Sequence, residues 1–132
     1  MTNIDQIQLT ITTGSDDLNR GHRVFLGFTG RYGREFRCRE LDGDGNPFTS
    51  NSTVTLRFGN LSNIENPNLN DPRNPAMDDL QVGRAYVRID PDSEHEWLIQ
   101  AAQVFINGTL THQLRTPGIM LDEDASEIVY LD

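Results

Sequence analysis

The sequence predicts an all-β fold, an eight-stranded antiparallel β-sandwich. Apolar and polar residues alternate with a period of two in many short runs, which is the pattern of half-buried strands. Turn-forming residues, above all glycine, asparagine and aspartate, separate the runs at the spacing of a sandwich. No segment carries the sustained 3.6-residue apolar stripe of an amphipathic helix.

The predicted strands follow one another along the whole chain. They cover the runs 7–11, 24–28, 36–38, 54–58, 85–89 and 104–106, the hairpin partner of 104–106 at 109–110, and 128–131. Asn107-Gly108 favours a two-residue type I′ turn before that hairpin partner. Residues 100–103 could pass for a helical turn, but their flanks are strand-like. Cys38 is the only cysteine, so no intrachain disulfide forms and we expect a small buried apolar residue there.

One long segment, 59–79, breaks the alternation and is predicted to be a loop. It is rich in asparagine and contains Pro67, Pro72 and Pro75. Proline lacks the N–H that a sheet ladder needs, so this segment cannot lie inside a sheet. A loop of this length in a compact domain is usually functional or mobile.

Length and charge limit the function classes. With 132 residues, 36% of them apolar, the chain can bury one core, and no internal repeat or second core marks a domain boundary. The net charge of −9 argues against a nucleic acid as partner, and it opposes anionic lipid unless bound cations reverse the local sign. No signal peptide or membrane-spanning run is visible. We therefore expect a soluble protein, either cytoplasmic or secreted by a route without a leader.

Motifs for catalysis are missing from the sequence. It has no nucleophile elbow, no phosphate-binding glycine loop and no metalloprotease motif, so we predict that the protein is not an enzyme. The three histidines, His22, His95 and His112, lack the spacing of a zinc site. A hydrolase that uses clustered carboxylates is the weakest alternative, because 20 acidic residues always offer some pair.

The segment Asp42-Gly43-Asp44-Gly45-Asn46 has the chemistry of a calcium loop. It places three oxygen-bearing side chains at alternate positions, with glycines that let the backbone curl around an ion. Thr53 stands where an EF-hand has its glutamate, and a strand follows rather than a helix, so an EF-hand is excluded. The same residues also suit a plain exposed turn, and both interpretations stay open.

Short motifs follow one another along the chain in a recognisable order. They are Ile11-Thr12-Thr13-Gly14, Asn19-Arg20-Gly21-His22, Leu41-Asp42 with Phe48, Leu80-Gln81-Val82-Gly83, Trp97-Leu98-Ile99 and Leu121-Asp122-Glu123-Asp124. This order resembles the PLAT (lipoxygenase-homology) family of β-sandwiches, which includes the membrane-binding module of bacterial phospholipase C toxins. The resemblance implies a single PLAT-like domain over 1–132. Segment 59–79 looks like an insertion, and both His22 and Ile119-Met120 depart from the family pattern.

The resemblance also implies a calcium site at one end of the sandwich, assembled from three loops. Its ligands would be Asn19 and the Gly21 carbonyl, then Asp42, Asp44, Gly45 and Asn46, and finally Glu96 or its neighbour Glu94. Pro47 stands where some family members have a further aspartate, and Asp16 or Asp17 could replace that ligand.

The resulting expectation is a non-enzymatic module that docks, assisted by calcium, on a membrane lipid surface or a partner protein. Its expected exposed apolar residues are Leu18, Tyr32, Leu61 and Ile64. The alternative is a calcium-free structural or interaction protein that uses the 59–79 loop to bind a protein or a glycan. The sequence does not indicate an oligomeric state.

Overall fold

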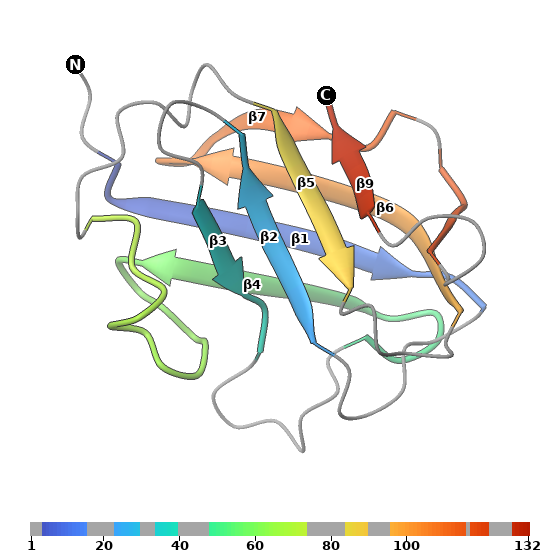
Figure 1. The fold of residues 1–132 in the computed structure, drawn as a ribbon, viewed down its shortest axis with the longest axis horizontal. Helices are drawn as coiled ribbons and strands as arrows, with labels where there is room; N and C mark the ends of the chain where they lie inside the picture. The colour runs from blue at the N-terminus through green and yellow to red at the C-terminus, as the bar shows by residue number, and fades with distance from the viewer. Residues whose placement is uncertain are drawn as a thin grey trace.

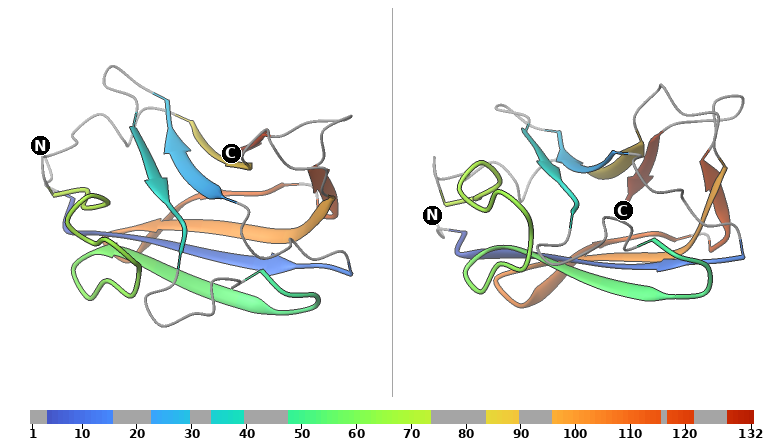
Figure 2. Two further views of the ribbon diagram at one scale, coloured as in Figure 1. Left: turned by 60° about the horizontal axis from the view of Figure 1, so that its bottom comes forward. Right: turned by 90° about the horizontal axis from the view of Figure 1, so that it is seen from below.

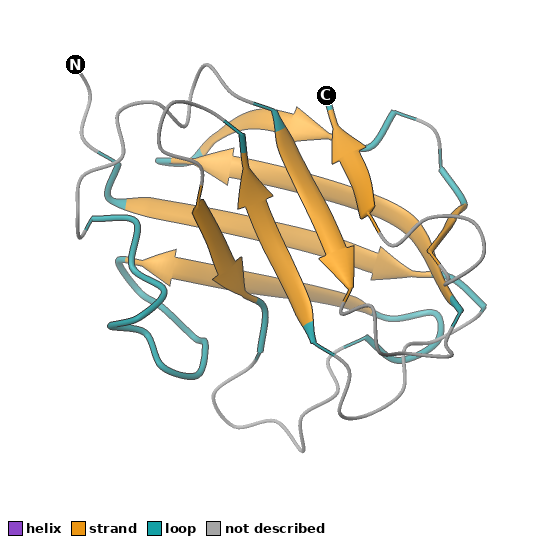
Figure 3. Cartoon of the chain, in the orientation of Figure 1, coloured by secondary structure: helices purple, strands orange, loops and turns teal. Residues whose placement is uncertain are grey.

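The computed structural model describes residues 4–15, 23–29, 34–39, 48–73, 84–89, 96–115, 117–121 and 128–132. These residues form two antiparallel sheets that pack as separate layers, and none of them is helical (Figures 1, 2 and 3). The strands are β1 (Gln6–Thr13), β2 (Val24–Phe28), β3 (Arg34–Arg37), β4 (Thr53–Gly59), β5 (Ala85–Ile89), β6 (Trp97–Ile106), β7 (Thr109–Gln113), β8 (Ile119–Leu121) and β9 (Ile128–Leu131). The predicted all-β sandwich is confirmed, with nine strands in the described part of the chain rather than eight. The additional strand is β8.

The five-stranded sheet is built around β1. Its order is β4-β1-β6-β7, with β8 also paired to β6. Every second residue of β1 is buried, as the alternation predicted, so one face of this strand lies on the core. Residues 100–103 lie within β6 and form no helical turn.

The four-stranded sheet has the order β3-β2-β5-β9. It lies in front of the five-stranded sheet in Figure 1. Its strands bury alternate residues against the other sheet, and no strand in the described part of the chain covers the opposite face.

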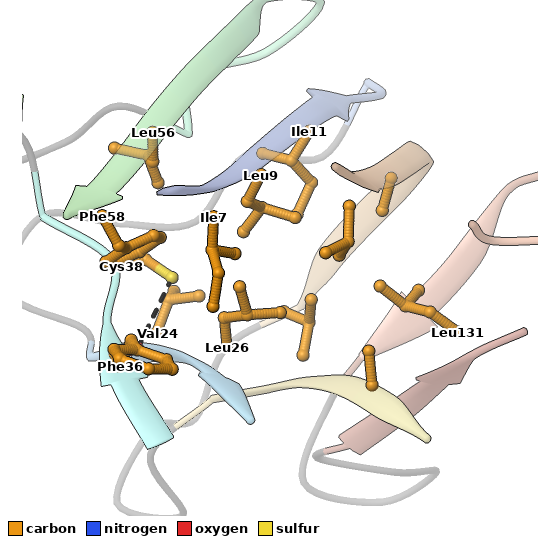
Figure 4. Packing of buried hydrophobic residues seen from close by; sticks show 14 of the residues in the cluster. Ile7, Leu9, Ile11, Val24, Leu26, Phe36, Cys38, Leu56, Phe58 and Leu131 are labelled. Atoms are coloured by element: carbon orange, nitrogen blue, oxygen red, sulfur yellow. Dashed lines mark hydrogen bonds between the residues drawn. The ribbon is translucent and has the colours of Figure 1, made fainter. Parts of the chain in front are cut away.

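Aromatic and branched side chains from both sheets fill the space between the layers (Figure 4). The largest fully buried ones include Trp97, Phe28, Phe36 and Phe58. Each such side chain contributes about 1.5–3 kcal/mol through its removal from water. Cys38 is buried among them, as predicted, and its thiol donates to the Phe36 carbonyl oxygen at 3.7 Å. Burial raises the pKa of this thiol to about 12, so it behaves as a small apolar group.

The β6–β7 hairpin has the predicted two-residue turn. Asn107 and Gly108 both have positive φ, 52° and 82°, which a type I′ turn requires. The Asn107 side chain also accepts hydrogen bonds from the backbone N–H groups of Asp5 and Gln6, at 2.8 and 3.1 Å. This turn therefore positions the start of β1 as well as reversing the chain.

No helix in the described residues is long and apolar enough to cross a membrane.

Candidate functional site

Four connections between strands leave from the same end of the sandwich. In the five-stranded sheet, the pairs Thr12–Thr53 and Thr13–Ile99 show that β1 ends where β4 and β6 begin. In the four-stranded sheet, β2 and β9 begin where β3 and β5 end, since Arg88 pairs with both Phe25 and Ile128. The segments 14–23, 38–52, 90–96 and 122–127 link these strand ends, which lie toward the lower and right side of Figure 1.

These four connections concentrate the negative charge of the chain. They contain thirteen of the 20 acidic residues but only three of the 11 arginines. The acidic residues are Asp16, Asp17, Glu40, Asp42, Asp44, Asp90, Asp92, Glu94, Glu96, Asp122, Glu123, Asp124 and Glu127. Of these, Glu96 lies within the described residues. A concentration of negative charge in the sequence of these connections favours cations over an anionic surface. We call this end of the sandwich the acidic end.

Backbone hydrogen bonds join the flanks of the three predicted calcium loops. The N–H of Gly14, at the start of the first loop, donates to the Leu98 carbonyl just after the third, at 2.8 Å. The Gly14 carbonyl accepts from Asn51, at the end of the second loop, at 2.9 Å. The flanks of the three loops, which are far apart in the sequence, are therefore neighbours in the folded sandwich.

Trp97 ties the same three flanks together through its side chain. It is fully buried, and its indole N–H donates to Thr13 Oγ1 at 3.1 Å. Its ring packs on Phe48, with 4.8 Å between the centroids. Thr13 precedes the first loop, Phe48 lies at the end of the second, and Glu96 immediately precedes Trp97.

The predicted ligands are mostly beyond what the structure describes. Asn19, Gly21, Asp42, Asp44, Gly45 and Asn46 lie outside the described residues, as do Leu18 and Tyr32. Glu96 is described, and it is exposed at the acidic end. The donor set of carboxylate, amide and carbonyl oxygens fits the hard ligands that calcium prefers, and the joined flanks fit a site made from three loops. The calcium site itself stays a prediction.

The predicted 59–79 loop is described over residues 60–73, where it packs firmly on the sandwich. The Asn63 side chain accepts from the Arg57 N–H and donates to the Thr55 carbonyl, both at 2.8 Å, which fastens the loop to β4. The buried Asn70 side chain accepts from the Arg37 N–H at 2.8 Å, which fastens it to β3. The loop thus connects the edge strands of the two sheets at the left of Figure 1.

One prediction for this loop was wrong. Ile64 was expected to be exposed for docking, but it is 1% exposed and belongs to the core, because the loop folds back over the edge of the sandwich. Leu61 is exposed, as predicted, at 75%. Leu69 is equally exposed, at 77%, and the sequence analysis missed it. An isolated leucine between two asparagines was the signal that could have found it.

No family model matches this sequence, and no curated protein matches it. Solved structures do match. The alpha toxin of Clostridium absonum has a TM-score of 0.62 at 15% identity, over 98% of this chain and 32% of the toxin. The alpha-toxin of Clostridium perfringens, from the avian strain SWCP, has a TM-score of 0.63 at 15% identity, over 99% of this chain and 32% of the toxin.

The chain thus spans about a third of the length of these toxins. At 15% identity the likeness concerns the fold. It confirms the sequence-based resemblance, and the chain has the PLAT-like β-sandwich fold present in these clostridial alpha-toxins.

Proposed function

We propose that this protein is a non-enzymatic binding module that docks on a membrane lipid surface through its acidic end, with calcium bound between the loops. The observation that carries the proposal is the convergence of the three loop flanks on Gly14 and Trp97. The fold shared with the clostridial alpha-toxins supports a docking role rather than catalysis. A partner protein is the other surface to which such an end could dock.

Calcium has a defined physical task in this proposal. An end that gathers thirteen acidic residues repels anionic lipid headgroups. A divalent cation held by Asp42, Asp44, Asn46 and Glu96, with Asn19 and the carbonyls of Gly21 and Gly45, would reverse the local sign of the charge. It would also link the loops to one another, so that they meet the surface as one unit.

Calcium titration calorimetry, combined with vesicle sedimentation, tests this proposal. We expect calcium to bind, to raise the melting temperature relative to excess chelator, and to be required for sedimentation with phosphatidylserine-containing vesicles. The double substitution Asp42→Asn with Asp44→Asn should abolish all three effects. Its matched control is Asp78→Asn with Asp79→Asn, which removes the same charge from outside the four connections of the acidic end. Identical melting with calcium and with chelator, and no heat of binding, would refute the calcium part.

Loop 60–73 supports a second candidate, a calcium-free interaction surface for a protein or a glycan. Leu61 is held in the left-handed region, at φ 59°, and exposes three quarters of its side chain. A bulky residue in that conformation on a firmly packed loop stores strain, which is characteristic of functional segments. Removal of the loop would remove Ile64 from the core and Asn70 from β3, so point substitutions are the appropriate test.

The pair Leu61→Ser and Leu69→Ser separates the two candidates. Both side chains are exposed, so the melting temperature should stay unchanged. If the acidic end is the docking site, calcium-dependent sedimentation with vesicles persists in this variant. Loss of sedimentation while calcium still binds would instead assign the lipid contact to the loop and contradict docking through the acidic end.

A further inference from the structure

The outer face of the four-stranded sheet carries an unusual set of side chains. The strand registers place them in two rows across the sheet. One row contains Arg37, Phe25, Arg88 and Ile128, and the other contains Glu35, Gly27, Tyr86 and Tyr130. Arginine and aromatic residues are the types that are enriched in recognition surfaces. We call this surface the arginine–aromatic face, and it is turned toward the viewer in Figure 1.

Gly27 leaves space for the aromatic ring of Tyr86 to lie against the sheet. A Cβ at this position would fall 2.1 Å from Tyr86 Cζ and 2.4 Å from both Cε2 and the phenolic oxygen. The phenol end of Tyr86 therefore lies directly over the glycine, with one side of the ring on the sheet. Tyr130 stands beside it at an interplanar angle of 65°, with 5.8 Å between the centroids, and is 43% exposed. The two rings come from the neighbouring strands β5 and β9.

A hydrogen-bonded network fixes the Tyr86 ring before any ligand arrives. Arg88 forms a bidentate pair with Glu35, at 2.7 and 2.8 Å, and the Tyr86 hydroxyl donates to the same carboxylate at 2.7 Å. The Arg88 guanidinium also lies 4.2 Å from the centroid of Phe25. The hydrogen bonds from Arg88, and to a lesser extent that from Tyr86, hold the pKa of Glu35 below its usual value. Burial, together with the hydrogen bond to Glu35, raises the pKa of Tyr86 to about 12. Side chains held in one rotamer lose little entropy on binding.

The charge of this face differs from that of the chain as a whole. Arg37, Arg84 and Arg88 outnumber Glu35 and Asp132 here, whereas the whole chain has a net charge of −9. Arg84 lies 4.7 Å above the Tyr130 ring, and its side chain is 61% exposed. The outer face of the five-stranded sheet, by contrast, carries mainly threonines and glutamines, with Arg57 and Phe105 on either side of Gln8.

We propose that the arginine–aromatic face binds an acidic glycan, one whose sugars carry carboxylate or sulfate groups. A sugar ring presents a face of C–H groups, which packs on an aromatic ring, and Tyr86 with Tyr130 provides that contact. The acidic group of the sugar pairs with Arg84 or Arg37, since guanidinium groups match planar and tetrahedral oxyanions. Arg84 pairs with Asp132 at 3.3 Å, but this ion pair is exposed, so an acidic sugar can exchange with it. Aromatic rings beside these arginines favour an acidic glycan over a neutral one, for which the arginines would have no use.

The experiment is calorimetric titration in chelator, with four probes of the same length. They are a heparin-derived hexasaccharide, a galacturonic acid hexamer, the neutral cellohexaose and a hexaglutamate peptide. At least one of the two acidic sugars should bind, more tightly than both cellohexaose and hexaglutamate, and binding should weaken as the salt concentration rises. Absence of binding by both acidic sugars would overturn the proposal, and so would equal binding of cellohexaose or of hexaglutamate.

Substitutions then locate the site. Tyr130→Ala and Arg84→Gln change exposed side chains and should each weaken the acidic sugar about fivefold or more, the size of one stacking or charge contact. Arg57→Gln is the matched control, because it removes one positive charge from the opposite sheet. We expect it to change the affinity less than twofold, roughly the limit for a residue outside the contact. An equal loss with Arg57→Gln would show non-specific attraction and contradict the assignment.

Discussion

The indole N–H of Trp97 donates to the hydroxyl of Thr13 at 3.1 Å, and both residues are buried at the acidic end of the sandwich. Thr13 ends β1 and Trp97 begins β6, so this bond joins two strands where the first and third predicted calcium loops leave the sheet. A buried indole N–H without a partner is costly, which makes Thr13 a structural support of the candidate site.

Replacement of Thr13 by valine should therefore lower the free energy of unfolding by about 1–3 kcal/mol, because it leaves the Trp97 N–H unpaired in the core. Thr13→Ser keeps the hydroxyl and should lose clearly less. Urea denaturation followed by the fluorescence of Trp97, the single tryptophan, measures both. Equal losses in the two variants would mean that the methyl group of Thr13, rather than the hydrogen bond, stabilises the fold.

Gly27→Ala should destabilise the protein by about 1–3 kcal/mol, because the new Cβ would displace the Tyr86 ring from the sheet and break its bond to Glu35. In a Tyr86→Ala background the sign should reverse. There Gly27→Ala should stabilise by about 0.5–1 kcal/mol, since alanine suits a strand better than glycine. A double-mutant cycle from thermal or urea unfolding gives the coupling, and a cycle that shows simple additivity would contradict the contact.

Asn70→Ala should loosen loop 60–73 and lower the free energy of unfolding by about 1–3 kcal/mol, because the Arg37 N–H loses its acceptor. Asn68→Ala, at an exposed position of the same loop, is the control and should change stability by less than about 0.5 kcal/mol. Limited proteolysis should cleave the Asn70 variant within the loop sooner than the control. The same cleavage rate in both variants would show that Asn70 does not hold the loop.

The Glu35–Arg88 pair should make stability depend on pH in the acid range. The Arg88 hydrogen bonds hold the pKa of Glu35 below its unfolded value, so the carboxylate stabilises the fold above that value and loses its contribution as pH falls through the folded pKa. Glu35→Gln should be less stable than the parent chain near neutral pH. The difference should begin to shrink below about pH 4, where an ordinary glutamate takes up a proton, and should disappear only once the pH lies below the lowered pKa of folded Glu35. A difference that is constant from neutral to acid pH would show that the charge of Glu35 plays no part.

The positions of the strands were largely predictable from the sequence, because period-two alternation is a local consequence of having one buried face. Ile7, Leu9 and Ile11 had to share a face, and the structure buries all three. The Asn107-Gly108 turn was equally local, since few residue pairs accept two positive φ angles. Strand β8 was missed because three residues are too short for a period to show. Its three residues form a strand because they pair with the first residues of β6.

Loop 60–73 shows where local reasoning ends. Its prolines and asparagines correctly excluded a sheet, but they do not tell which side of the loop faces inward. Ile64 and Leu61 have similar sequence surroundings, yet one is buried and the other exposed. Asn63 and Asn70 determine this by hydrogen bonds to β4 and β3, which lie in different sheets.

By itself the sequence determined the fold class, the positions of most strands, the loop at 59–79 and the chemistry of the candidate calcium residues. The tertiary structure decided what comes together: the flanks of three loops around Trp97, the closure of the sandwich edge by Asn70, and the alignment of Arg88, Glu35 and Tyr86 across three strands. Alternation and turn preference depend on neighbours within a few residues, and they can be recognised in one sequence. Pairing between distant strands depends on register and packing over the whole chain, which no local pattern encodes.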